Sequence, residues 1–270
     1  MSRISDKFTD LRNNGRKGFI PFITAGDPDH STSVKIALKL AEMGADVIEL
    51  GVAFSDPVAD GPTIQRSSQR ALSAGTSLSK TLDLVREVRL TSNVPIVLFS
   101  YLNPLLAFGL DRLPGEAAEA GIDGLLVTDA VGSELERVRH PFRDAGLAMI
   151  SLIAPTTTDT RLRSICSAPT GFIYAVSRAG VTGANEKMSS DAQILVERAR
   201  QFTDLPIAVG FGISTREQVE NVWRYADAAV VGSAIVSEIE RTVDADDAVE
   251  RVQSFVRALL PEFAKTRGEI

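Results

Sequence analysis

Eight short apolar runs, rich in β-branched residues, recur along this chain of 270 residues, and helical patterns separate them. Most of the runs are continuously apolar, as is typical of parallel strands that helices cover on both faces. Eight strand–helix units within about 250 residues are typical of a (β/α)8 barrel, so we predict a TIM barrel. A doubly wound open sheet is the alternative. The predicted strands are 19–24, 46–50, 94–99, 123–127, 148–153, 171–176, 205–209 and 227–231.

Helical patterns fill the segments between the predicted strands. Gly44, Gly121 and Gly146 stand where three helices should end, because glycine readily adopts the left-handed conformation that stops a helix. Residues 3–14 predict an extra helix before the first strand, in a position to close the bottom of the barrel. We see no linker or low-complexity tract and predict a single TIM-barrel domain over 1–270. The other predicted helices are 33–43, 63–74, 133–145, 191–203, 215–225 and 245–260.

Composition and charge argue against several classes of function. A net charge of −6 without a basic block disfavours nucleic-acid binding. No apolar run approaches the roughly 20 residues of a membrane span, and the N-terminus lacks a signal-peptide pattern, so we expect a cytoplasmic protein. Cys166 is the only cysteine, which excludes a disulfide framework and a thiolate metal cluster. His30 and His140 lie far apart, so we expect no metal site.

Glu49 interrupts the apolar run of the second predicted strand. Side chains alternate along a strand, so Glu49 points into the barrel if Ile48 and Leu50 face the helices. Burial there raises a carboxyl pKa towards the range that suits general acid–base catalysis. The alternative is a structural glutamate paired with a cation across the barrel. No Lys or Arg is present in three of the neighbouring strands, 19–24, 94–99 and 171–176, which favours the catalytic interpretation.

Asp60 follows on the long loop 51–62, within the segment "VADGP". Long ordered loops often carry functional residues, although an aspartate before glycine is also a common turn residue. Two carboxylates that reach one pocket from different elements can divide the chemistry. The more buried one transfers a proton, and the more solvated one stays charged and holds a developing positive group.

Glycine-rich segments follow the last three predicted strands, at 177–186, 210–214 and 231–236. In TIM barrels the loops after the seventh and eighth strands often bind phosphate through backbone N–H groups and a helix N-terminus. Ordinary turn glycines are the alternative. No Walker motif and no third glycine of a dinucleotide fingerprint is present, so nucleotide hydrolysis and NAD binding are not expected. Residues 178–190 predict a lid, or else a flexible loop.

Four long motifs in the same order and spacing carry a resemblance to a known family: "IELGVAFSDPVADGPTIQ", "YLNPLLAFG", "FIYAVSRAGVTGA" and "VGFGIS" with "VVGSAIV". Together they resemble the tryptophan synthase α subunit along essentially the whole chain. The resemblance implies a (β/α)8 barrel that cleaves indole-3-glycerol phosphate to indole and glyceraldehyde 3-phosphate in tryptophan biosynthesis. It also implies a tryptophan synthase β subunit as partner in an α2β2 assembly, with pyridoxal phosphate (PLP) only in that partner. No metal or organic cofactor is expected in this chain.

The resemblance assigns roles to individual positions. Glu49 matches the general acid–base residue, Asp60 matches the carboxylate that holds the indole N–H, and Tyr174 matches a tyrosine near Glu49. Positions that match the residues packing the indole ring, which by themselves read as barrel core, are Phe22, Leu126 and Phe211. Positions that match the phosphate cradle are Gly183, Gly212, Gly232 and Ser233. Thr182 matches the lid threonine that meets Asp60 on closure.

Two segments depart from the family pattern. Ala53 stands where the family usually has proline, and "TDAVGSELE" keeps Asp129 but lacks the proline that usually follows it. Asp129 is still expected to order the loop 51–62. Pro57 and the segment 101–109 are expected to face the partner, although a plain strand–helix loop is the alternative. These departures bear on coupling to the partner rather than on the reaction.

Three other functions remain to be weighed. A stand-alone indole-3-glycerol phosphate lyase would use the same barrel and release free indole. A phosphate-binding isomerase or cyclising synthase often needs a lysine at a strand end, and the predicted strand ends offer none. A non-catalytic binding subunit would not need both Glu49 and Asp60.

Overall fold

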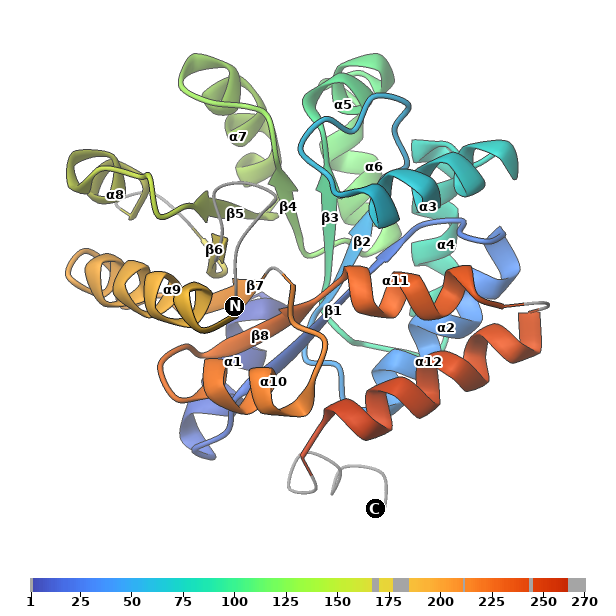
Figure 1. Cartoon of the computed structure of the whole chain (residues 1–270). Helices are drawn as coiled ribbons and strands as arrows, with labels where there is room; N and C mark the ends of the chain where they lie inside the picture. Colours follow the sequence, from blue (N-terminus) through green and yellow to red (C-terminus); the bar gives the residue numbers. More distant parts are fainter. Residues whose placement is uncertain (1, 167–169, 177–184, 211, 243–244, 262–270) are drawn as a thin grey trace.

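The computed structural model describes residues 2–166, 170–176, 185–210, 212–242 and 245–261. Eight parallel strands close into a barrel in sequence order, and helices surround it (Figure 1). The first and last strands pair directly with each other, which confirms the predicted TIM barrel and shows that the open-sheet alternative is wrong. The strands are β1 (Gly18–Thr24), β2 (Ile48–Gly51), β3 (Ile96–Ser100), β4 (Gly124–Val127), β5 (Ala148–Ile153), β6 (Ile173–Val176), β7 (Ile207–Gly210) and β8 (Ala228–Val231).

The helices follow the strands around the barrel, with two of them between β2 and β3 and two after β3. Their bounds are α1 (Arg3–Asn13), α2 (His30–Glu42), α3 (Pro62–Ser73), α4 (Leu78–Arg89), α5 (Leu102–Phe108), α6 (Leu113–Ala120), α7 (Ser133–Asp144), α8 (Asp159–Cys166), α9 (Asn185–Arg200), α10 (Arg216–Trp223), α11 (Ser233–Glu240) and α12 (Ala245–Leu259). All eight predicted strands and the six predicted helices that follow strands overlap elements of this set.

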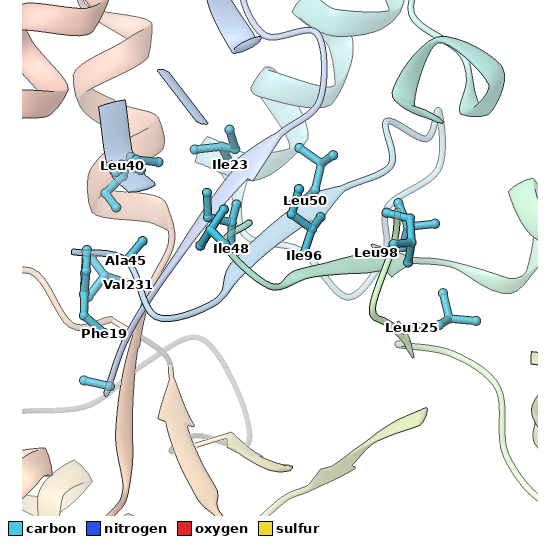
Figure 2. Close-up of a cluster of buried hydrophobic side chains, with 14 of the residues drawn as sticks. Phe19, Ile23, Leu40, Ala45, Ile48, Leu50, Ile96, Leu98, Leu125 and Val231 are labelled. Atoms are coloured by element: carbon cyan, nitrogen blue, oxygen red, sulfur yellow. The ribbon is translucent and has the colours of Figure 1, made fainter. Parts of the chain in front are cut away.

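One hydrophobic core lies between the strands and the surrounding helices. Ile48 and Leu50 of β2 belong to it, and Figure 2 shows both among buried side chains such as Ile23, Leu40 and Ile96. Since side chains alternate along a strand, the residue between Ile48 and Leu50 points the other way, into the barrel.

A second, smaller core fills the inside of the barrel, and α1 closes its amino-terminal end. Ile4, Phe8 and Leu11 of α1 pack in the same cluster as interior strand residues, and the rings of Phe8 and Phe172 lie 5.6 Å apart. The predicted N-terminal helix and its place beneath the barrel are thus confirmed. With the bottom closed, the carboxyl ends of the strands form the mouth.

Aspartates at the entries of β2, β4 and β8 hold neighbouring strands in register at the closed end. Each carboxylate accepts the backbone N–H of a residue at or near the start of the preceding strand, at 2.8–3.0 Å. Hydrogen bonds of this kind satisfy backbone N–H groups that have no partner strand at the ends of the strands. The pairs are Asp46 with Phe19, Asp123 with Ile96, and Asp227 with Ile207.

Candidate active site

Glu49 lies inside the barrel mouth, as predicted. Its side chain is on the interior face of β2, in register with Phe22 of β1 and Val97 of β3. The residue is only 1% exposed, and within the described residues neither carboxylate oxygen has a hydrogen-bond partner. Burial raises its pKa to about 8. The alternative of a structural ion pair is therefore not supported, and a buried carboxyl group without a partner among the described residues is a candidate functional group.

Asp60 lies on the loop between β2 and α3 and is partly buried. Burial raises its pKa to about 6, and a hydrogen bond with the Tyr101 hydroxyl opposes that rise. At pH 7 Glu49 is therefore mostly protonated, whereas Asp60 is mostly ionised. The sequence predicted such a difference in burial between the two carboxyl groups, and their roles as proton donor and fixed negative charge stay a prediction.

Tyr174 of β6 brings a hydroxyl group to the same place from the opposite side of the barrel. Its pKa is raised well above the ordinary value by burial, and then by the charges of Glu49 and Asp60. The hydroxyl therefore stays protonated, close enough to both carboxyl groups for their charges to raise its pKa. A Cβ at Gly210 of β7 would overlap this hydroxyl, so the absence of a side chain there makes room for Tyr174.

Aromatic rings line the mouth between these polar groups. The ring centroids of Phe22 and Phe99 are 5.3 Å apart at an interplanar angle of 78°, and those of Phe99 and Tyr174 are 6.4 Å apart at 67°. Leu126 of β4, in register with Phe99, is fully buried in the same interior cluster. Phe99 was not predicted from the sequence. Its position two residues after Val97, on the interior face of β3, was the signal that could have identified it.

Tyr101 is a second residue near the site whose contribution was not predicted from the sequence. Its hydroxyl accepts the backbone N–H of Ala59 at 3.0 Å, and its ring lies 5.3 Å from that of Phe54 on the loop after β2. Asp129 accepts the backbone N–H of Leu102 at 2.7 Å, so it orders the segment after β3. Our expectation that Asp129 orders the loop 51–62 thus holds only indirectly, because Tyr101 makes the contact with that loop.

The predicted phosphate end lies beside the ring site. Because β7 and β8 pair, Gly212 and Gly232 follow neighbouring strands at the same rim. A Cβ at Gly232 would lie 3.4 Å from the Cβ of Phe22, which places this rim next to the aromatic cluster. Ser233 begins α11, whose N-terminus has no side-chain cap and leaves backbone N–H groups for an anion. Gly212 has a φ of +72°, so turn geometry alone also explains that glycine.

Some predicted features fall outside the described residues. They include part of the predicted lid 178–190, and the residues Thr182, Gly183 and Phe211. Among the residues that the structure covers, no group of three His, Cys, Asp or Glu side chains is arranged to hold a metal ion. In the same part of the chain, no helix is long and apolar enough to cross a membrane.

A cavity of about 290 Å³ lies at the opposite, closed end of the barrel. Arg16, Lys17, Asp46, Glu220 and Trp223 are among the residues that line it. None of the predicted site residues contributes to that cavity, so it is separate from the carboxyl pair at the mouth.

Comparison with known proteins gives one consistent result. The sequence pattern of the family described as "Tryptophan synthase alpha chain" matches residues 8–263. The tryptophan synthase alpha chain of Citrifermentans bemidjiense is 48% identical over 259 residues, covering 96% of this chain and 97% of that protein. The corresponding chain of Acidiphilium cryptum is 45% identical over 275 residues, covering 100% and 99% of the two chains.

Solved structures agree with the sequence relatives. The tryptophan synthase subunit alpha of Legionella pneumophila superposes with a TM-score of 0.85 at 34% identity, covering 96% of this chain and 98% of that one. A chain in the structure of M. tuberculosis tryptophan synthase in its aminoacrylate-bound form gives 0.85 at 32% identity, with the same coverage. The family whose motifs the sequence resembles is thus shown over nearly the full length, and the chain belongs to the tryptophan synthase alpha chain family, as an enzyme subunit.

Proposed function

We propose that this chain cleaves indole-3-glycerol phosphate to indole and glyceraldehyde 3-phosphate, the step that supplies indole for tryptophan. The observation that carries the proposal is the pair formed by Glu49, buried and without a partner in the described residues, and Asp60, which is more solvated. Their pKa values of about 8 and about 6 give one protonated and one ionised carboxyl group at neutral pH.

The retro-aldol reaction needs both forms at once. Protonated Glu49 gives its proton to C3 of the indole ring, and the positive charge that develops on the ring nitrogen is held by ionised Asp60. The C–C bond then breaks as the glycerol hydroxyl loses its proton to the carboxylate that Glu49 has become. The protons balance over the reaction, because Glu49 ends the cycle protonated. Carboxyl groups suffice for these steps, and we propose that the chain needs no metal or organic cofactor.

Binding at two ends would fix the scissile bond between them. Phe22, Phe99 and Leu126 offer apolar surface for the indole ring, and the backbone after β7 and at the start of α11 suits the phosphate. Positioning a substrate in this way removes much of the entropic barrier to reaction. The roles assigned by resemblance to Thr182, Gly183 and Phe211 remain part of the proposal.

We also propose that the chain works with a PLP-containing tryptophan synthase β subunit in an α2β2 assembly. Val58, Leu106 and Val131 are exposed apolar residues on the segments after β2, β3 and β4. Exposed apolar side chains on these segments are compatible with a protein contact at this end of the barrel. Family membership favours this coupled enzyme over the stand-alone lyase. The cytoplasmic location expected from the sequence stays a prediction.

The test is an assay of the purified chain on indole-3-glycerol phosphate, with and without a β subunit. Glu49→Gln should abolish cleavage while the protein stays folded and still binds glycerol 3-phosphate. Cleavage by wild-type protein that a β subunit does not accelerate would support the stand-alone lyase instead. Full activity in the Glu49→Gln variant, or no cleavage by wild-type protein in either condition, would overturn the proposal.

A further inference from the structure

A cluster of ion pairs ties α11 to α3 outside the proposed site. Glu240, the last residue of α11, accepts hydrogen bonds from Arg66 at 2.6 and 2.8 Å and from Arg70 at 2.9 Å, both on α3. Arg70 also forms a bidentate ion pair with Asp27, in which it donates two hydrogen bonds at 2.7 and 2.8 Å. We call these four residues the α3–α11 clamp.

The clamp rests on a buried anchor. The side chain of Asp27, in the loop after β1, is fully buried, and the guanidinium group of Arg70 is its charged partner. Burial raises the pKa of Asp27, while Arg70 acts to lower it. One planar guanidinium group thus joins two carboxylates from different elements, a geometry that arginine supports and lysine does not. Two carboxylates and two guanidinium groups make the cluster neutral overall.

The two helices that the clamp joins begin near opposite ends of the proposed substrate site. The amino end of α11, at Ser233, is the candidate phosphate cradle, whereas α3 begins two residues after Asp60. Besides the clamp, the eight-residue helix α11 is held by three buried side chains, Ile235, Val236 and Ile239. Apolar contacts along one face allow a short helix to slide or tilt, and directional hydrogen bonds at its far end restrict that motion.

From this arrangement we propose that Glu240 is a positioning residue for phosphate recognition. Through Arg70 and Arg66 it holds α11 in the position at which the backbone N–H groups of its amino end meet the phosphate. The inference rests on the proposed function, because it takes the phosphate to bind at the start of α11. Glu240 itself touches no substrate in this scheme.

Glu240→Gln is the test variant, because it breaks the charged contact to α3 and leaves the buried pair of Asp27 and Arg70 in place. Glu238→Gln is the matched control. Glu238 lies on the same helix, and among the residues that the structure describes its carboxylate pairs with its neighbour Arg241, at 2.6 Å. Both changes remove one negative charge from α11, and that loss alone would favour an anionic ligand in both variants. A weaker affinity confined to Glu240→Gln therefore cannot be a simple charge effect.

Binding of glycerol 3-phosphate, of inorganic phosphate and of indole is measured by calorimetry, well below the melting temperature of each variant. We expect Glu240→Gln to weaken both phosphate ligands roughly three- to thirtyfold, with indole affinity unchanged and Glu238→Gln close to wild type. In the cleavage assay the KM should rise by a similar factor while kcat changes little, as for a lost uniform binding interaction.

Three results would overturn the inference in different ways. If wild-type protein binds both phosphate ligands but the two variants bind them equally well, the clamp has no positioning role and the proposed reaction still stands. If wild-type protein binds neither phosphate ligand, the phosphate end of the proposed function fails together with the inference. A lower melting temperature of Glu240→Gln with unchanged phosphate affinity would mean that the clamp is only structural.

Discussion

Burial of Glu49 should make the stability of this protein depend on pH in a way that one substitution removes. An unfolded chain exposes this carboxyl group, whose pKa then returns from about 8 to its ordinary 4.5. Between these two values the unfolded state loses its proton while the folded state keeps it, so folding becomes progressively less favourable as the pH rises. Below pH 4.5 both states are protonated and the penalty is absent; above pH 8 both are ionised and the penalty is constant.

The size of the effect follows from the shift. The difference of 3.5 pKa units, 8 minus 4.5, corresponds to about 5 kcal/mol at pH 9 and about 3 kcal/mol at pH 7. Glu49→Gln has nearly the shape of the protonated acid and cannot ionise. We therefore expect the variant to match wild type at pH 4 and to exceed its free energy of unfolding by these amounts at pH 7 and pH 9.

Urea unfolding followed by circular dichroism at pH 4, 7 and 9 measures the difference directly. Glu119→Gln, at an exposed position of α6, is the control, and its free energy of unfolding should change with pH as that of the wild type does. If the free energy of unfolding of Glu49→Gln also changes with pH as that of the wild type does, Glu49 is not held in a desolvated site. The proton-donor role would then lose its physical basis.

Three further predictions concern the site. The kcat/KM for indole-3-glycerol phosphate should fall below about pH 6, where Asp60 gains a proton, and above about pH 8, where Glu49 loses one; a profile that is flat from pH 5 to pH 9 would contradict these roles. Tyr101→Phe removes the hydroxyl that holds the loop after β2, and should lower kcat about tenfold with little change in melting temperature; an unchanged kcat would show that the loop is held by other contacts. Gly210→Ala should displace Tyr174 and lower the free energy of unfolding in urea by about 1–3 kcal/mol. Gly115→Ala, where a Cβ meets nothing within 4 Å, should lower it much less, and equal effects would mean that Tyr174 is free to move.

The fold could be predicted from the sequence because its signals are local and repeated. Each strand is a short apolar run and each following helix has a matching apolar face, so eight copies of one pattern define the barrel. Burial of Glu49 was predictable for the same reason, since Ile48 and Leu50 fix which way it points. Strand alternation also places Phe99 on the interior face of β3, but a phenylalanine there is as common in an ordinary barrel core as in a site.

Other parts of the site depend on contacts between segments far apart in the chain. Tyr101 matters because its hydroxyl reaches Ala59, and Gly210 matters because Tyr174 needs the space above it. Neither pairing has a pattern in the sequence, since nothing near Gly210 indicates which side chain will lie against it. The contact of Glu240 with α3 is hidden in the same way, because an acid at the end of a helix normally reads as solvated surface.

The environment of Glu49 shows why apolar neighbours belong to the chemistry. A lysine in place of Val97 or Phe22, the residues in register with Glu49, would stabilise its ionised form and recover part of the stability lost to burial. The same cation would lower the pKa of Glu49 and leave it without a proton to give to indole at neutral pH. Stability and proton donation therefore place opposite demands on these positions. Val97 and Phe22 keep water and charge away from Glu49 and so set its pKa.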